Sequence, residues 1–282
     1  MILYLWAMVQ IIGESLPISS SGHVALLQFL LYGSQEVGCK NLGAFDDCLQ
    51  GVSAIIFFIY FFAPWWKLII AKPIALHFLF DIKIWQHKIL PALWFVVVAD
   101  CITFVCWYAD FAHYINIPLC VGFFITGCVL WSMHYAQEKK DIDLWSLKNS
   151  LIVGFVQGLA LFSGVSRFAC TMASLQWLGY CRLPAFFISF LIEWPLIFAA
   201  SVKGCILLQH ASILQMMSNG LCIDSVESYH MELFIDAVAC FSIIAYLCLY
   251  QIEIMIDKNN LWKFSYYMIL PTTVALWMWL SI

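Results

Sequence analysis

Residues 10–23 read Gln10-Ile-Ile-Gly-Glu14-Ser-Leu-Pro17-Ile-Ser19-Ser20-Ser21-Gly22-His23, and the rest of the chain is organised around them. Apolar sequence flanks these residues on both sides, so a carboxylate, three consecutive hydroxyls and an imidazole lie in an apolar surround. Pro17 and Gly22 interrupt any continuous helix. Polar side chains and irregular backbone are costly inside a membrane unless they line a cavity or are buried in protein. The segment is therefore predicted to be a functional site.

The composition predicts an all-α polytopic membrane protein. Of 282 residues, 64% are hydrophobic and only 11% are charged, whereas soluble domains carry about 25% charged residues. No basic stripe suggests a nucleic-acid partner. The twelve cysteines are scattered and form no CxxC pair, so we expect packed thiols rather than zinc or a disulfide framework. A cleaved signal peptide is not expected, because the N-terminal apolar run is short and contains Glu14.

Apolar segments of two kinds alternate with more polar loops. Six are predicted to be membrane spans: 48–63, 89–108, 117–135, 184–207, 233–256 and 262–281. Two others, 1–32 and 150–180, are broken by turn residues. A span needs about 20 residues, so the short halves of each broken segment are predicted to form a helical hairpin that enters the membrane and returns.

The distribution of basic residues predicts the orientation. Ten of them fall in loops on one side: Lys67, Lys72, Lys83, Lys88, Lys139, Lys140, Lys148, Arg182, Lys258 and Lys263. Only Lys40 falls in a loop on the other side. The positive-inside rule makes the first side cytoplasmic. This threading requires the first broken segment to enter from outside and the second to enter from inside.

A short internal repeat agrees with this threading. Val9–Ser20 aligns with Val156–Arg167 at a constant offset of 147, which superimposes a Gln and, nine residues later, a Ser. Opposite membrane entry of two similar segments is typical of inverted-topology repeats with a site near the membrane midplane. We therefore predict one integral membrane domain, 1–282, with a first repeat over 1–135 and a second over 150–282.

The second broken segment supplies a cation. Arg167 follows Ser166 within otherwise apolar sequence, so it requires an anionic partner or a wet cavity. An ion pair with Glu14 alone would satisfy that requirement, but it would leave the serine run and the histidine without a role. The planar fork of Arg matches phosphate oxygens, and hydroxyls and N–H groups at a helix start add donors. A phosphate site is the better interpretation.

The first segment adds groups that act on phosphates. Ser20 with His23 nearby is the minimum for nucleophilic attack on phosphorus or for proton delivery to a leaving group. Glu14 can hold a divalent cation, Mg²⁺ or Ca²⁺, or act as a base. Gln10 lies one helical turn before Glu14, so the two share a helix face and could share a ligand.

These motifs resemble a known family. The 10–23 segment is similar to the first signature of the BacA/UppP-type undecaprenyl pyrophosphate phosphatases, and Leu159–Arg167 is similar to their second signature, LALxPGxSRSG. Weaker similarities follow in the family's order: Phe45-Asp46 with Gln50, Ser189-Phe190-Leu191 with Pro195, and Phe264 with Tyr267. The resemblance covers nearly the whole chain.

The resemblance implies a multi-pass phosphatase of the bacterial inner membrane. The outward entry of the first broken segment predicts that its site faces the periplasm. It would hydrolyse C55 isoprenyl pyrophosphate to the monophosphate, which recycles the lipid carrier of cell-wall synthesis. By position it assigns four catalytic residues: the metal-associated acid Glu14, the nucleophile or phosphate ligand Ser20, the general acid/base His23 and the pyrophosphate clamp Arg167. It assigns substrate donors at Ser19, Ser21 and Ser166, beside Gln10.

The chain also departs from the family pattern. Ser163 replaces a Pro, and Phe168 and Ala169 replace the Ser and Gly that follow the Arg. Glu193 replaces a small apolar residue within a span. Together with Asp100, it either faces the cavity as a secondary metal or proton site or pairs with polar groups of the bundle.

Three alternatives stay open at this point. A transporter or flippase for a lipid phosphate could use the same inverted repeats, although transport needs no Ser20–His23 pair. A degenerate member kept for assembly is a further alternative. A homodimer is also compatible with the sequence, although Gly122 and Gly127 lack the GxxxG spacing.

Overall fold

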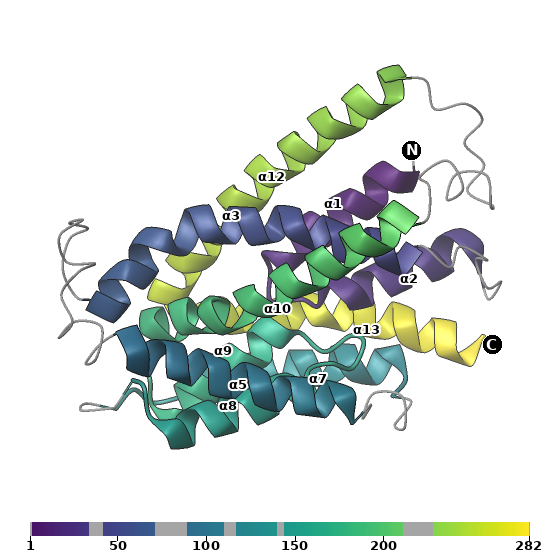
Figure 1. Cartoon of the computed structure of the whole chain (residues 1–282). Helices are drawn as coiled ribbons and strands as arrows, with labels where there is room; N and C mark the ends of the chain where they lie inside the picture. The colour runs from purple at the N-terminus through teal and green to yellow at the C-terminus, as the bar shows by residue number, and fades with distance from the viewer. Residues whose placement is uncertain are drawn as a thin grey trace.

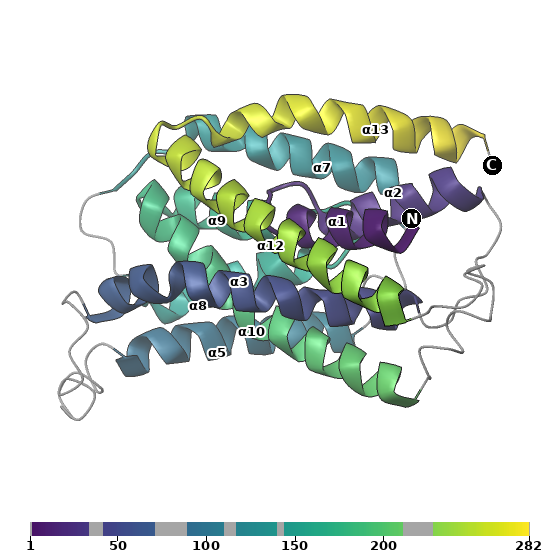
Figure 2. The same cartoon turned by 90° about the horizontal axis from the view of Figure 1, so that it is seen from above.

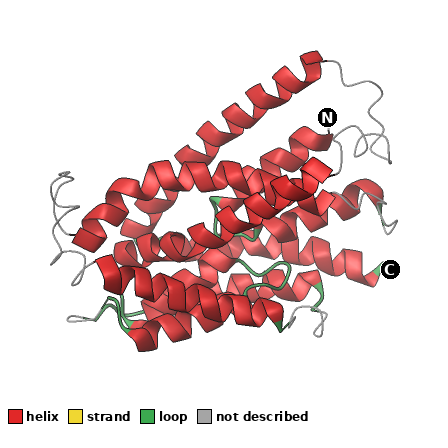
Figure 3. Cartoon of the chain, viewed as in Figure 1, coloured by secondary structure: helices red, strands yellow, loops and turns green. Residues whose placement is uncertain are grey.

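The computed structural model describes residues 2–33, 42–70, 89–109, 117–139, 144–210 and 228–281, and every regular element among them is helical (Figure 3). The elements, labelled as in Figure 1, are α1 Ile2–Glu14, α2 Ser20–Tyr32, α3 Leu42–Ile70, α5 Leu90–Tyr108, α7 Leu119–Ser132, η3 Met133–Tyr135, α8 Leu147–Leu159, α9 Arg167–Leu178, α10 Arg182–His210, α12 Ser228–Asp257, η4 Leu261–Lys263 and α13 Phe264–Leu280. All six predicted spans form helices, and each broken segment forms two short helices.

The helices present an apolar exterior. Among the described residues, four helical segments are long and apolar enough to cross a membrane: Gly43–Ile69, Leu90–Tyr108, Arg182–Leu208 and Leu233–Asp257. Large apolar side chains such as Ile59, Val105 and Ile243 are exposed on the outside of the bundle. Exposed apolar area of this extent is unfavourable in water and is expected against lipid. The protein is a multi-pass membrane protein, as its composition predicts.

Two breaks separate the helices of each pair: the first break, residues 15–19, lies between α1 and α2, and the second break, residues 160–166, lies between α8 and α9. The helix after each break is capped in the same way. In the first, the backbone of Ser19 has a positive φ of 64°, and its hydroxyl accepts a hydrogen bond from the Gly22 amide at 3.3 Å. In the second, the Ser166 hydroxyl accepts a hydrogen bond from the Ala169 amide, also at 3.3 Å. Ser19 and Ser166 are the two serines that the sequence repeat superimposes. Each therefore begins the second helix of its pair as an N-cap.

The two helix pairs approach the middle of the bundle from opposite ends. α1 begins and α2 ends at the end of the bundle that holds both chain termini, whereas α8 begins and α9 ends at the opposite end (Figures 1 and 2). Their breaks touch in the interior, because a Cβ added at Gly22 would lie 2.7 Å from the Cα of Gly164. Only residues without side chains allow two backbones to approach this closely.

Many of the contacts between helices join one half of the chain to the other. α1 packs against α12 and α8 against α5, while α2 packs against α13 and α9 against α7. α3 packs against α10, and α7 against α13. These contacts are retained if the first-half helices are exchanged for their second-half counterparts in chain order, whereas the contacts of α9 with α10 and of α1 with α3 have no comparable counterpart. The two halves are thus intertwined rather than placed side by side.

Aromatic rings fill the core next to the second break. The ring of Phe190 in α10 lies 4.7 Å from that of Phe57 and 4.5 Å from that of Phe61, both in α3. The ring of Phe168 in α9 lies 4.6 Å from that of Phe190. Phe168 is 2% exposed, so this departure from the family pattern anchors α9 in the α3–α10 core.

Candidate active site

The two breaks enclose a cavity of about 160 Å³. Its lining comes from the first break, the second break and α10, and consists of Gly13, Glu14, Leu16, Ser19, Ser20, Ser21, Ala160, Leu161, Val165, Ser166, Arg167, Phe168 and Glu193. Six of the eight residues predicted from the sequence are among them. Gln10 and His23 are not.

Ten of the lining residues form five pairs related by the sequence repeat. Each pair is separated by the same offset of 147 residues: Gly13 with Ala160, Glu14 with Leu161, Ser19 with Ser166, Ser20 with Arg167, and Ser21 with Phe168. Equivalent positions of the two breaks therefore face one space. The sequence alignment predicts which residues meet there, although it does not give the packing that brings them together.

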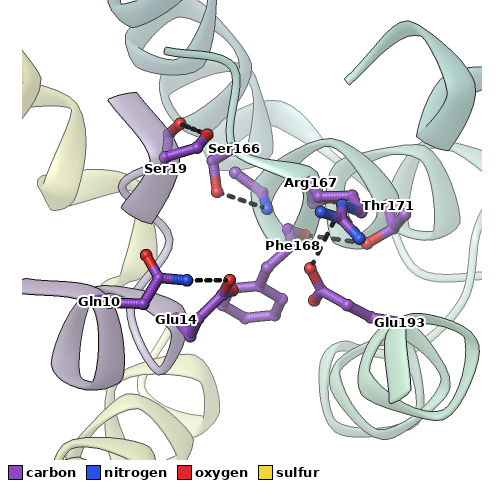
Figure 4. Close-up of polar contacts among 10 residues, drawn as sticks. Gln10, Glu14, Ser19, Ser166, Arg167, Phe168, Thr171 and Glu193 are labelled. Carbon is purple, nitrogen blue, oxygen red and sulfur yellow. Dashed lines mark hydrogen bonds and ion pairs between the residues drawn. The ribbon is translucent and has the colours of Figure 1, made fainter. Parts of the chain in front are cut away.

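Glu14 ends α1 with its carboxyl group in the cavity. The Nε2 atom of Gln10 donates a hydrogen bond to the Glu14 Oε1 atom at 3.1 Å (Figure 4). Gln10 is fully buried, so it acts from behind and fixes the direction of the carboxyl group. The Ser20 side chain also lies close to this carboxyl group. The predicted shared helix face of Gln10 and Glu14 is confirmed.

The serines surround the start of α2. Ser19 is the N-cap, and its hydroxyl lies 3.5 Å from the hydroxyl of Ser21. Ser20 is buried, whereas Ser21 is exposed. The positive end of the helix dipole and three hydroxyl donors thus point at the cavity, which is an arrangement that favours an anion.

Arg167 is the first residue of α9, and the loop before it is fixed by α7. The Ser166 amide donates to the Thr126 hydroxyl at 2.9 Å, and that hydroxyl donates to the Gly164 carbonyl at 2.9 Å. Thr126 is fully buried. Sequence reasoning missed Thr126, because a threonine in an apolar span carries no signal of the loop it supports.

Glu193, and not Glu14, is the carboxylate paired with Arg167. The Arg167 Nε atom lies 3.8 Å from the Glu193 Oε1 atom (Figure 4). Glu193 is 3% exposed, and its Oε2 atom has no hydrogen-bond partner among the described residues. Glu193 lines the cavity, and its role as a secondary metal or proton site stays a prediction. Asp100 is not among the lining residues.

His23 holds the first break against α13 rather than lining the cavity. Its Nδ1 atom lies 2.8 Å from the Ser19 carbonyl oxygen, and its Nε2 atom lies 3.0 Å from the Tyr267 hydroxyl. Because a carbonyl only accepts, Nδ1 carries the proton, and in the neutral ring Nε2 accepts from Tyr267. The two rings stack with centroids 5.9 Å apart. His23 therefore contacts the Ser19 backbone and does not face the cavity directly.

The cavity offers oxygen ligands for a hard divalent cation. The described residues contain no cluster of three or more His, Cys, Asp or Glu side chains that could hold a metal by themselves. Glu14 and the unpaired oxygen of Glu193 face the same space. Mg²⁺ is commonly held by one or two carboxylates together with substrate phosphate oxygens. The donor set fits a cation bound in that way.

Comparison with known proteins agrees with these motifs. The family model described as "Bacitracin resistance protein BacA" matches residues 3–274. An undecaprenyl-diphosphatase of Elusimicrobium minutum is 32% identical over 207 residues, which cover 70% of this chain and 73% of that protein. One of Methanosphaera stadtmanae is 31% identical over 92% of this chain and 90% of its own length. One of Hahella chejuensis is 27% identical over 98% of this chain and 97% of its own. This chain belongs to the bacitracin resistance protein BacA family.

Proposed function

We propose that this protein is an undecaprenyl-diphosphatase. It hydrolyses the phosphoanhydride bond of C55 isoprenyl pyrophosphate and releases undecaprenyl phosphate and inorganic phosphate. The single observation that carries the proposal is the cavity between the two breaks, where Glu14, the serine run and Arg167 meet. Family membership and the names of the relatives support the choice of substrate.

The pyrophosphate binds between two helix starts. α2 and α9 both begin at the cavity, so the positive ends of two helix dipoles point at the same anion. Arg167 adds a forked cation that contacts two phosphate oxygens at once. In the absence of substrate, Glu193 neutralises Arg167. The incoming phosphate takes the place of Glu193 as the partner of the guanidinium group.

Hydrolysis requires in-line attack on the terminal phosphorus. The nucleophile is either the Ser20 hydroxyl or a water molecule in the cavity, and Glu14 accepts its proton. The bond from phosphorus to the bridging oxygen breaks, and the lipid monophosphate leaves. If Ser20 attacks, water then cleaves the phosphoserine. Arg167 and the N–H groups of the helix starts stabilise the charge that develops on the phosphate oxygens.

A divalent cation, Mg²⁺ or Ca²⁺, is held at Glu14 in this proposal. When bound, it neutralises phosphate charge and helps to orient the terminal phosphate. Gln10 keeps the Glu14 carboxylate in a fixed direction, so this carboxylate would hold the cation at the cavity. His23, the acid/base implied by the family resemblance, bonds the Ser19 carbonyl and the Tyr267 hydroxyl. In this proposal it holds the start of α2 in place, and Glu14 takes the proton.

The fold proposed for this site is a pair of inverted repeats with re-entrant hairpins. Three observations support it: the paired lining residues, the shared serine caps, and two pairs of equivalent helix contacts, α1–α12 with α8–α5 and α2–α13 with α9–α7. α1 and α2 would enter the membrane from one face, and α8 and α9 from the other. The boundaries remain 1–135 and 150–282 within a single domain.

The orientation places the first hairpin toward the periplasm of the bacterial inner membrane. The end of α3, the starts of α8 and α10 and the turn from α12 to α13 lie at the opposite end of the bundle (Figure 1). These helix ends carry the described basic residues Lys67, Lys148, Arg182, Lys258 and Lys263, and Lys139 bonds Gly179 just after α9. Lys203 lies near the end of α10 that faces the chain termini. Lys40, Lys72, Lys83, Lys88 and Lys140 lie outside the described residues. A homodimer is not needed for the site, since one chain supplies all of the described lining.

The test is phosphate release from C55 pyrophosphate by the purified protein, with added Mg²⁺ or Ca²⁺ and with EDTA. We expect release that EDTA abolishes and that either cation restores. Folded protein that binds the lipid but releases no phosphate under any of these conditions would contradict the proposal. Movement of the head group across liposomes without phosphate release would instead establish the lipid-phosphate flippase.

A further inference from the structure

Two thiols lie together where α3 and α10 meet, outside the cavity. The Cys48 and Cys205 Sγ atoms are 3.3 Å apart although the residues are 157 positions apart in the chain. Cys48 is partly buried, and Cys205 is exposed. A disulfide bond has a length of about 2.05 Å, so a small rotation of either side chain would bring the sulfurs to bonding distance.

The backbones of α3 and α10 also approach closely beside this pair. A Cβ added at Gly204, next to Cys205, would lie 2.5 Å from the Cys48 amide nitrogen and 2.7 Å from the Ala44 carbonyl oxygen. A Cβ at Gly51 would collide with the Ser201 hydroxyl. Each helix therefore presents a glycine where the other approaches. Close approach of the two helices is what a disulfide between them requires.

The surroundings place this pair at a water-exposed surface. Asp47 and Lys203 form an ion pair at 3.2 Å between the same two helices, and Lys203 is 62% exposed. An exposed ion pair is costly in lipid hydrocarbon, so this end of the α3–α10 contact lies at the membrane–water boundary. It is the end of the bundle that also holds both chain termini (Figure 1). Water-soluble oxidants reach thiols at such a position.

We propose that Cys48 and Cys205 form a reversible disulfide that links the two halves of the protein through α3 and α10. The oxidant is a soluble disulfide, either a small molecule or a protein. The supply of that oxidant rests on the proposed outward orientation of this end, because disulfides form and persist outside the cytoplasm. The geometry of the pair itself is independent of the proposed phosphatase activity.

The reaction is two successive thiol–disulfide exchanges. The exposed Cys205 thiolate attacks one sulfur of the oxidant, the oxidant's S–S bond breaks, and one oxidant thiol leaves. The Cys48 thiolate then attacks the Cys205 sulfur of the mixed disulfide, and the second oxidant thiol leaves. Two protons leave the cysteines and two protonate the oxidant thiols, while two electrons pass to the oxidant. Cys48 is the resolving thiol because it is the less accessible of the two.

The experiment treats the purified full-length protein with oxidised glutathione, blocks remaining thiols with N-ethylmaleimide, and maps cysteine states by mass spectrometry after non-reducing proteolysis. We expect most of Cys48 to be recovered in a peptide linked to Cys205, and dithiothreitol to release it. Recovery of both cysteines only as blocked or glutathionylated peptides would overturn the proposal. Cys181, an exposed thiol before α10, is the internal control and should show no link to Cys48.

Two variants sharpen the result. In Cys48→Ser, the attacking thiol has no resolving partner, so Cys205 should accumulate as the glutathione mixed disulfide. In Cys205→Ser, Cys48 should be recovered mainly as the blocked thiol. Equal glutathionylation of the remaining cysteine in both variants would contradict the assigned order of attack. The mapping requires no phosphate release, so a failed phosphatase assay and a failed disulfide are distinguishable outcomes.

Discussion

The first and second helix breaks have the same backbone device but different chemistry. Both begin a helix with a serine cap, and equivalent positions of the two breaks line one cavity. At those positions the first break carries Glu14 and Ser20, whereas the second carries Leu161 and Arg167. The carboxylate and the guanidinium group of the site thus come from different halves. The repeated backbone therefore supplies two anion-binding helix starts. The side chains differ: the first break supplies the proton acceptor, and the second supplies the cation that binds phosphate.

The carboxyl group of the first break has the largest predicted effect. Glu14→Gln keeps the shape of the side chain but removes the proton acceptor and the cation ligand, so kcat for phosphate release should fall about 10³-fold. Its position in the second break is Leu161, which cannot compensate. Glu253→Gln, the same change at a carboxylate that bonds Tyr60 outside the cavity lining, is the control. Comparable activity of both variants would contradict the claim that the first break supplies the catalytic carboxylate.

The contact between the breaks can be disrupted directly. Gly164 has a φ of 86°, and a Cβ there would lie 2.8 Å from the Leu119 carbonyl oxygen. Gly164→Ala should therefore lower the free energy of unfolding by about 3 kcal/mol and reduce activity as the two breaks separate. In Gly43→Ala a new Cβ meets nothing within 4 Å. Thermal unfolding in detergent measures both, and an unchanged midpoint for Gly164→Ala would contradict the close approach.

The two caps should behave alike if the breaks are equivalent in structure. Ser19→Ala and Ser166→Ala each remove one hydrogen bond to a helix-start amide, at a cost of about 1 kcal/mol of stability. Similar losses in the unfolding midpoint are expected for both. If only one substitution destabilised the protein, the shared capping device would not be what holds both breaks.

The smallest predicted effect is a change in KM when Glu193, the ion-pair partner of Arg167, loses its charge. Glu193→Gln removes the charge that neutralises Arg167 before substrate binds, so KM should fall about three- to tenfold, equivalent to about 1 kcal/mol, with little change in kcat. Steady-state kinetics at saturating Mg²⁺ measures both constants. A higher KM together with a raised Mg²⁺ requirement would instead assign Glu193 to the cation.

Local sequence predicted the breaks, the helices and most of the cavity lining. Proline, glycine and serine act within a few residues of themselves, so the interruptions at 15–19 and 160–166 could be placed from the sequence. The offset of 147 residues then identified which positions meet. The ion pair of Arg167 with Glu193 could not be predicted, because it depends on how α9 rests against α10.

Contacts between distant helices also explain the other differences between the sequence predictions and the structure. His23 was expected in the cavity by its spacing from Ser20, but contact with Tyr267 of α13 turns it elsewhere. Thr126 supports the second loop across a helix contact that spacing does not encode. The proximity of Cys48 to Cys205 depends on the glycine contacts of α3 and α10, which the scattered cysteine spacing does not encode.

The most direct test of the account is phosphate release from C55 pyrophosphate by Arg167→Ala. Arg167 is the only cation among the described cavity-lining residues, and the account makes it the contribution of the second break to the transition state. Arg182→Ala, which breaks an exposed pair with Glu138 outside the cavity lining, is the matched control. We predict that kcat/KM falls at least about 100-fold for Arg167→Ala and stays near the wild-type value for the control. Near-normal turnover by folded Arg167→Ala protein would contradict a site built from both breaks.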